Sequence, residues 1–314
     1  YDTIIIGAGA AGLMCAGEHT GRTLLIDHIK APGEKIRISG GGRCNFTNLY
    51  SSPENFLSHN QHFSKSALSR YTQWDFIELV KRYKIEYHEK TLGQLFCDGS
   101  SKQIIEMLLT QLHKTNTELK LSCIVRNLRK IETGFELILE ENNIQTNVKT
   151  KQLVIATGGK SIPKMGATGF AYDIAKQFSI PLTETRAALV PLIFSDAKFQ
   201  PLVGTSTATR VYNAKASFDE GMLFTHRGLS GPSILQISSY WREGEVIFIN
   251  LVPNISILEE LKKQRQEQGK RNLTTVLSYY IPARLVEYLA EPLTLSGKLA
   301  DQSDIRLRDI CKAL

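Results

Sequence analysis

The chain has 314 residues, 42% of them hydrophobic and 22% charged, which is typical of a globular protein with two or three domains. No apolar run approaches the ~18 residues that span a membrane. Five scattered cysteines without a Cys-x-x-Cys pair argue against a disulfide framework and a zinc site. We therefore expect a cytoplasmic protein with no metal and no membrane contact. Because the net charge of +7 is spread among alternating acids and bases, the sequence favours a small-molecule substrate over a nucleic-acid partner.

The first chemical motif lies at residues 3–27, where the sequence predicts a strand, a glycine turn, a helix and a second strand. Gly7-x-Gly9-x-x-Gly12 directly follows the apolar run TIII. In the dinucleotide fingerprint the first glycine makes the turn, the second admits the pyrophosphate and the third packs the helix on the strand. Asp27 ends the second strand, where an acid accepts ribose hydroxyls and disfavours a 2′-phosphate. The motif therefore predicts FAD or NAD rather than NADP.

A second glycine cluster, ISGGGRCNFTN, covers residues 38–48. Three consecutive glycines are costly in entropy and allow a close approach to the backbone. An NAD enzyme has no use for this second surface, whereas the longer FAD molecule needs one. We expect Arg43 near the pyrophosphate or a flavin carbonyl and Asn45 donating to the flavin ring. A third glycine segment, at 157–159, is expected to pass over the first glycine turn.

Further along the chain, residues 101–113 predict a helix whose apolar face contains Ile104, Ile105 and Leu108. Strands are predicted at 120–125, 134–139 and 152–156. Trp74 is predicted to lie in a helix core rather than to stack on a flavin.

From about residue 191 the chain becomes β-rich, and from Ser256 it becomes helical, opened by a capping box at 256–259. The predicted fold class is α/β. We expect a Rossmann-like FAD-binding domain at 1–190, a β-rich, barrel-like insert domain at 191–254 and a helical domain at 255–314.

The motifs also carry a family resemblance. GAGAAG, SGGGRCNFTN, YHEKTLGQLFCD, IATGGKSIPKMGATGFAYDIA and LFTHRGLSGPSILQIS together resemble the HI0933-like (YhiN/BaiN-type) bacterial flavoproteins, from residue 3 to about 251. The resemblance implies a three-domain NAD(P)/FAD-dependent oxidoreductase. Family members include an aminoacetone oxidase and enzymes assigned to the reduction of unsaturated 3-oxo bile acids. Because substrates differ among family members, the resemblance predicts the cofactor better than it predicts the reaction.

Carried over by position, the resemblance implies pyrophosphate contacts from the first glycine turn and an adenosine ribose contact from Asp27. Lys35 and residues 39–45 would follow the middle and the flavin end, and the backbone of Val125 would meet the adenine. The family's C-terminal segment, GG…GLYF.GE…D..G..GGYN, which covers the pyrimidine side of the flavin, is not found before Leu314. The complete predicted cofactor set is Gly7, Gly9, Ala10, Ala11, Gly12, Asp27, Lys35, Ser39, Gly40, Gly41, Gly42, Arg43, Cys44, Asn45, Val125, Thr157, Gly158 and Gly159.

Catalytic residues are less clearly marked in the sequence. His226 is a candidate acid or base, and Arg227 is a candidate anion ligand; either is equally compatible with a structural role. His88 is a weaker candidate for the same chemistry. Cys44, beside Arg43, is a candidate low-pKa thiol, although packing against the flavin is favoured because no resolving cysteine is nearby.

The sequence thus predicts an FAD-dependent oxidoreductase with a non-covalent flavin. Two electrons would pass between NAD(P)H or an organic substrate and an acceptor. No second GxGxxG is present, so NAD(P)H would be a transient donor. Two alternatives remain open: an oxygen-using amine oxidase of the aminoacetone type, and a non-catalytic flavin- or RNA-binding protein.

Overall fold

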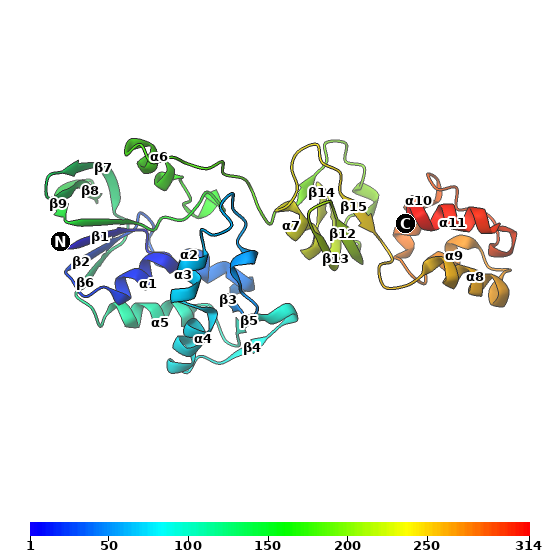
Figure 1. The fold of residues 1–314 in the computed structure, drawn as a ribbon, viewed down its shortest axis with the longest axis horizontal. Coiled ribbons are helices and arrows are strands. Elements are labelled where there is room, and N and C mark those ends of the chain that lie inside the picture. The colour runs from blue at the N-terminus through cyan, green and yellow to red at the C-terminus, as the bar shows by residue number, and fades with distance from the viewer. The chain divides into compact units, whose positions relative to one another are not determined.

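The computed structural model describes all residues from 1 to 314, and they form two compact units, 1–184 and 185–314 (Figure 1). Each unit is described by itself below. No helix of either unit has the length and apolar composition needed to cross a membrane.

Unit 1 is built on a four-stranded parallel sheet in the order β10-β1-β2-β6. All eight residues of the two central strands, TIII and TLLI, are buried. Such continuous burial is expected of parallel strands covered on both faces, and β-branched residues suit it. The strands of the sheet are β1 (Thr3–Ile6), β2 (Thr23–Ile26), β6 (Thr117–Lys120) and β10 (Gln152–Ile155).

The two faces of this sheet carry different layers. Ile5 and Leu25 pack in one cluster with residues of α1 and α5, whereas Ile4 and Leu24 pack in another with residues of β7 and β8. Figure 1 shows α1 and α5 on one side of the sheet, and the antiparallel β7-β8-β9 meander with α6 on the other. The meander consists of β7 (Ile124–Ile131), β8 (Gly134–Glu141) and β9 (Ile144–Thr150). The helices of unit 1 are α1 (Ala10–Glu18), α2 (Glu34–Ile38), α3 (Lys65–Arg70), α4 (Gln73–Arg82), α5 (Lys102–Leu112) and α6 (Phe170–Gln177).

A small antiparallel sheet, in the order β3-β5-β4, completes unit 1. Its strands are β3 (Asn45–Asn48), β4 (Tyr87–Glu89) and β5 (Gln94–Cys97). β3 begins directly after the second glycine cluster, which forms the 3-10 helix η1 (Ser39–Gly42). The glycine cluster is therefore held between α2 and the small sheet.

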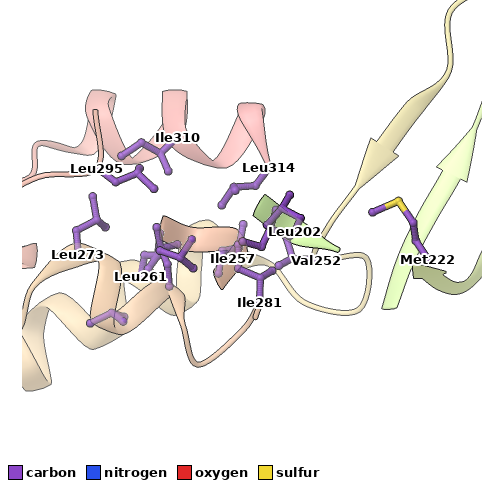
Figure 2. Packing of buried hydrophobic residues seen from close by; sticks show 14 of the residues in the cluster. Leu202, Met222, Val252, Ile257, Leu261, Leu273, Ile281, Leu295, Ile310 and Leu314 are labelled. Atoms are coloured by element: carbon purple, nitrogen blue, oxygen red, sulfur yellow. The ribbon is translucent and has the colours of Figure 1, made fainter. Parts of the chain in front are cut away.

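Unit 2 contains a five-stranded antiparallel sheet in the order β11-β14-β13-β12-β15, followed by a group of helices. One hydrophobic cluster runs from sheet residues such as Met222 to helix residues such as Leu261 and Ile310 (Figure 2). The strands are β11 (Leu192–Ile193), β12 (Ser206–Tyr212), β13 (Ser217–Thr225), β14 (Gly228–Ser230) and β15 (Phe248–Asn250). The helices are α7 (Pro232–Ser238), α8 (Ile257–Gln268), α9 (Leu273–Leu277), α10 (Ala283–Ala290) and α11 (Asp304–Ala313).

The predicted fold class is confirmed: a Rossmann-like α/β sheet is combined with β-rich and helical parts. Three local predictions are wrong. Trp74 is 55% exposed, because α4 turns Ile77, Leu79 and Val80 to the core instead. Residues 120–125 do not form one strand, since Ser122 has a φ of 53° and separates β6 from β7. Ser256 precedes α8, but its side chain caps no backbone amide.

Candidate dinucleotide-binding site

The first glycine turn joins β1 to α1 and owes its shape to close packing. Gly7 has a φ of 112°, and a Cβ atom there would lie 2.5 Å from the carbonyl oxygen of Ala156. A Cβ atom on Gly12 would lie 1.8 Å from the carbonyl oxygen of Gly7. Around Gly9, by contrast, a Cβ atom would meet nothing within 4 Å. Two glycines are thus required by the fold, and the third leaves the backbone open to a ligand.

The amino end of α1 is open as well. Gly9 is its N-cap, no side chain caps the helix, and the first turn has no acidic residue. Ala10 and Ala11 are exposed there. A helix end with unpaired N–H groups and the positive end of its dipole is suited to bind a phosphate.

Asp27 lies at the end of β2, beside this turn. It is 8% exposed, and its Oδ2 accepts a 2.6 Å hydrogen bond from the amide of Ala8. The amide of Cys123 donates to the Asp27 carbonyl at 2.9 Å. This bond brings the start of β7, and with it the half-buried Val125, to the carboxyl end of β2. Ribose and adenine contacts from these two positions are therefore geometrically compatible.

Residues 157–159 follow β10 and pass over the first glycine turn. A Cβ atom on Gly7 would lie 2.9 Å from the amide nitrogen of Thr157. The Thr157 hydroxyl is buried and has no hydrogen-bond partner in the protein. Lys35 of α2 reaches the same segment, with its Nζ 3.4 Å from the carbonyl oxygen of Gly159. An unsatisfied buried hydroxyl is costly, so a ligand atom is its natural partner here.

The second glycine turn has an unusual backbone. Gly40, Gly41 and Gly42 have φ values of 56°, 66° and 87°, all in the left-handed region that favours glycine. A Cβ atom on Gly40 would lie 2.7 Å from the Phe96 ring, whereas Cβ atoms on Gly41 and Gly42 would meet nothing within 4 Å. The turn therefore packs on Phe96 and presents its other two residues as bare backbone.

Ser101 anchors this turn, although the sequence gave no reason to choose it. Its hydroxyl donates to the Arg37 carbonyl at 2.7 Å, and its amide donates to the Gly42 carbonyl at 2.8 Å. Ser101 is 1% exposed. A serine before a helix usually indicates an N-cap, but here the hydroxyl binds α2 and leaves α5 uncapped.

The three residues after the turn differ in what they offer. Arg43 is exposed, and its guanidinium makes no ion pair or hydrogen bond within the protein. In the orientation that gives hydrogen-bond partners to its side-chain amide, the Asn45 nitrogen donates to the carbonyls of Thr47 and Leu95 at 3.1 and 3.3 Å. These two hydrogen bonds within the small sheet use the Asn45 NH₂ group that was predicted to donate to the flavin ring.

Cys44 and Cys97 are buried near each other, and their chemistry is that of protonated thiols. Burial raises the pKa of Cys44, although a hydrogen bond with Ser39 opposes the rise. Burial raises the pKa of Cys97 to about 11, and nearby Cys44 and Asp98 add to the rise. Neither thiol is a low-pKa nucleophile, so the packing role considered for Cys44 agrees better with its surroundings.

A row of side chains crosses the small sheet beside the turn. Phe96 of β5 is paired with Asn45 on one side and with His88 on the other. Directly opposed residues share a sheet face, and neighbouring strands lie about 4.8 Å apart. The His88 ring is stacked on the Phe96 ring, with centroids 6.2 Å apart and an interplanar angle of 17°. His88 is thus one side chain away from the glycine turn.

His88 also has an orienting partner. Its Nδ1 lies 2.6 Å from Oδ1 of Asp98, and both side chains are about half exposed. With Nδ1–H donating to the carboxylate, Nε2 is the ring nitrogen free to exchange a proton. The sequence marked His88 only weakly, because nothing in YHEK shows that Asp98 and the glycine turn are its neighbours.

His226 and Arg227 belong to unit 2. They form the exposed two-residue turn between β13 and β14, and neither side chain makes a hydrogen bond or ion pair. Nothing in their surroundings holds either side chain in one orientation. They remain sequence-based candidates, whereas all the predicted cofactor residues lie within unit 1.

These observations fit a bound dinucleotide. Bare backbone at Gly9, an uncapped helix, an orphaned Thr157 hydroxyl and a second bare surface at 41–42 all belong to one unit. Fold and site together define a Rossmann-fold, dinucleotide-binding protein of the flavoprotein oxidoreductase type. More narrowly, residues 1–297 match the model of the HI0933-like protein Rossmann domain, and the chain belongs to that family. The resemblance found in the motifs is confirmed.

Three curated relatives extend this result. The chain is 49% identical to the ribosomal RNA dihydrouridine synthase of Escherichia coli, over 98% of this chain and 78% of that protein. It is 42% identical to the protein of the same name from Haemophilus influenzae, over 98% and 79%. It is 23% identical to the 3-dehydro-bile acid delta(4,6)-reductase of Clostridium scindens, over 96% and 75%.

Proposed function

We propose that this protein is an FAD-dependent reductase of ribosomal RNA. The reaction adds a hydride and a proton across the C5=C6 bond of a uracil base, and NAD(P)H supplies the two electrons. The observation that carries the proposal is a pair of bare backbone surfaces, at Gly9 and at 41–42, in a chain 49% identical to a protein named for dihydrouridine formation.

The names of the three relatives share one chemistry. A uracil C5=C6 bond is conjugated with the C4 carbonyl. A 3-dehydro steroid with Δ4,6 double bonds likewise has C=C bonds conjugated with a ketone. Reduction in both cases needs a hydride at the electron-poor carbon and a proton at the carbon next to the carbonyl. This shared requirement favours a reductase over the amine oxidase considered from the sequence.

Reduced FAD, when bound, supplies the hydride, and the protein supplies binding and orientation. The first turn of α1 and Gly9 would bind the pyrophosphate, and Asp27 would accept hydrogen bonds from the ribose hydroxyls. The orphaned Thr157 hydroxyl would donate to an oxygen of the same group. The bare backbone at 41–42 and the unpaired guanidinium of Arg43 would take the flavin end.

We assign proton delivery to His88. Its Nε2–H would protonate the carbon next to the substrate carbonyl, while the Asp98 carboxylate holds the ring through Nδ1. Cys44 is less suited to this task because it is buried, at 5% exposure. General acid catalysis by a positioned histidine typically contributes about 10²- to 10⁴-fold.

The experiment begins with the anaerobic visible spectrum of the FAD-loaded protein on addition of NADH and then NADPH. Unmodified ribosomal RNA transcripts are added next, and dihydrouridine is quantified by mass spectrometry. We expect the flavin bands to bleach with one nicotinamide and to return as dihydrouridine forms. Bands that persist until aminoacetone is added, with peroxide produced in air, would assign the protein to the oxidases instead.

The His88 assignment is tested with His88→Asn and Asp98→Asn, using the exposed His113→Asn as a matched control. We expect flavin reduction by NAD(P)H at the wild-type rate in all three variants. Transfer to RNA should fall about 100-fold in His88→Asn and less in Asp98→Asn. Equal loss of both half-reactions would show a structural effect, and unchanged transfer would remove His88 from the mechanism.

A further inference from the structure

All the exposed large aromatic side chains of unit 1 lie in one short segment. Tyr50, Phe56, Phe63, Tyr71 and Trp74 are the aromatic residues among its exposed large hydrophobic residues. Phe63 is 80% exposed and Tyr50 is 71% exposed. Five exposed aromatic rings in one stretch of chain make this segment a candidate interaction surface. We call residues 50–74 the aromatic segment.

The aromatic segment has a small positive charge. Glu54 is its one acidic residue, against Lys65, Arg70 and two histidines, and Asp75 follows the segment directly. Neither Lys65 nor Arg70 is in an ion pair. Between Glu54 and Asp75 the chain therefore lacks the acids that alternate with bases elsewhere.

The segment contributes little to the core of its own unit. α3 has no buried residue, and residues 54–63 are all exposed. Its two ends are nevertheless fixed. The Leu49 amide donates to the Gly93 carbonyl at 2.9 Å, and Gln73 Nε2 donates to the Leu49 carbonyl at 3.1 Å. Figure 1 shows this chain leaving the small sheet after β3 and returning to it before α4.

The aromatic segment is connected to the second glycine turn by a single short strand, β3. β3 starts two residues after Arg43 and ends two residues before Tyr50. Four extended residues span about 13 Å, which is about two nucleotides of an extended single strand. A base placed at the glycine turn would thus have its neighbours within reach of the aromatic segment.

We infer that the aromatic segment binds single-stranded RNA, stacking unpaired bases on its rings and pairing phosphates with Lys65 and Arg70. Bases stacked on exposed aromatic side chains, with cations along the backbone, are the usual mode of recognition for unpaired RNA. The inference rests on the proposed function, and it names the surface that would hold the nucleotides next to the target uridine.

The test measures binding of a fluorescently labelled, single-stranded ribosomal RNA loop by anisotropy, using the FAD-loaded protein without NAD(P)H. Phe63→Ala and Trp74→Ala should each weaken binding about tenfold, in keeping with the loss of one stacked base. Tyr279→Ala, an exposed aromatic residue of unit 2, is the matched control and should bind like wild type. Thermal melting confirms that each variant is folded.

A second measurement isolates the charges. The double variant Lys65→Gln/Arg70→Gln should reduce the slope of log K against log salt by about 1.4, since each phosphate contact in a single strand contributes about 0.7. Ultraviolet crosslinking followed by mass spectrometry should place RNA on peptides from residues 50–74. Crosslinks confined to other peptides would overturn the inference.

The outcomes separate this inference from the proposed function. Wild-type affinity in the aromatic variants, with dihydrouridine still formed, would overturn the inference alone. Weakened binding in the variants, with no dihydrouridine formed by wild type, would support the RNA surface and overturn the reaction. Binding to anionic lipid vesicles in place of RNA, or self-association lost in Phe63→Ala, would also overturn the inference.

Discussion

Gly9 and Gly12 lie in the same turn, but the space around them differs. A Cβ atom on Gly12 would overlap the Gly7 carbonyl, whereas Gly9 has open space and an ordinary φ of −85°. We therefore expect Gly12→Ala to destabilise the protein by about 3 kcal/mol. Gly9→Ala should leave the apoprotein as stable as wild type and weaken FAD binding at least about tenfold, or 1.4 kcal/mol.

Melting of the apoprotein by circular dichroism and titration with FAD by fluorescence quenching check both expectations. Comparing Gly12→Ala with Gly9→Ala separates an effect on folding from an effect on FAD binding. Equal stability losses in the two variants would contradict the assignment of Gly9 to the ligand.

Cys97 gives a prediction about pH. Burial raises its pKa from 9.0 to about 11 in the folded protein. Because the unfolded thiol loses its proton first, its contribution to stability is present below about pH 9 and is lost as the pH rises towards 11. The urea midpoint should therefore fall more steeply between pH 9 and 10.5 in wild type than in Cys97→Ala. Parallel pH profiles for the two proteins would show that Cys97 does not titrate in this way.

At the scale of elements, the second glycine turn depends on one hydrogen-bonding residue from another helix. Ser101→Ala removes the donor to the partly buried Arg37 carbonyl and should cost about 1 to 3 kcal/mol. We also expect weaker FAD binding, since α2 and the turn are then less firmly held. Ser100→Ala, whose hydroxyl only accepts from the Lys102 amide, is the control, and denaturant titration is the measurement.

The elements show what local sequence can predict. The strand, glycine turn and helix at 3–18 followed from apolar pattern and glycine spacing, since both act within a few residues. The helix α5 followed from its apolar face, and the structure buries Ile104, Ile105 and Leu108 as expected. The exposure of Trp74 did not follow, because the orientation of α4 is set by its distant neighbours α1 and α5 in the core.

The same limit explains the candidate site. Glycines at 7–12 and 40–42 were evident because their backbone requirements are local. The row formed by Asn45, Phe96 and His88 combines a local pairing of β4 with β5 and a pairing of β5 with β3, which lies more than forty residues earlier in the chain. No local pattern encodes that pairing, and Ser101 likewise acts through a contact 64 residues away.

For the whole molecule, the two units have separate hydrophobic clusters. Leu25 is fully buried in a cluster of unit 1, and Leu261 is fully buried in the cluster of unit 2. We expect calorimetry to show two unfolding transitions. Leu25→Ala should lower the melting temperature of one transition, and Leu261→Ala that of the other. Each variant should reduce the free energy of unfolding of its own unit by about 2 to 5 kcal/mol. A single transition shifted by both variants would show that the units unfold as one.

The second glycine turn has a further consequence for the protein in the cell. None of its residues is buried, so its left-handed backbone depends on hydrogen bonds such as that from Ser101 and on the packing of Gly40 on Phe96. A ligand that binds only the folded turn adds RT ln(1 + [L]/Kd) to stability, about 4 kcal/mol at a thousand times Kd. The lifetime of the protein would then follow the supply of its dinucleotide, so that molecules left without cofactor would be the first to reach the proteases.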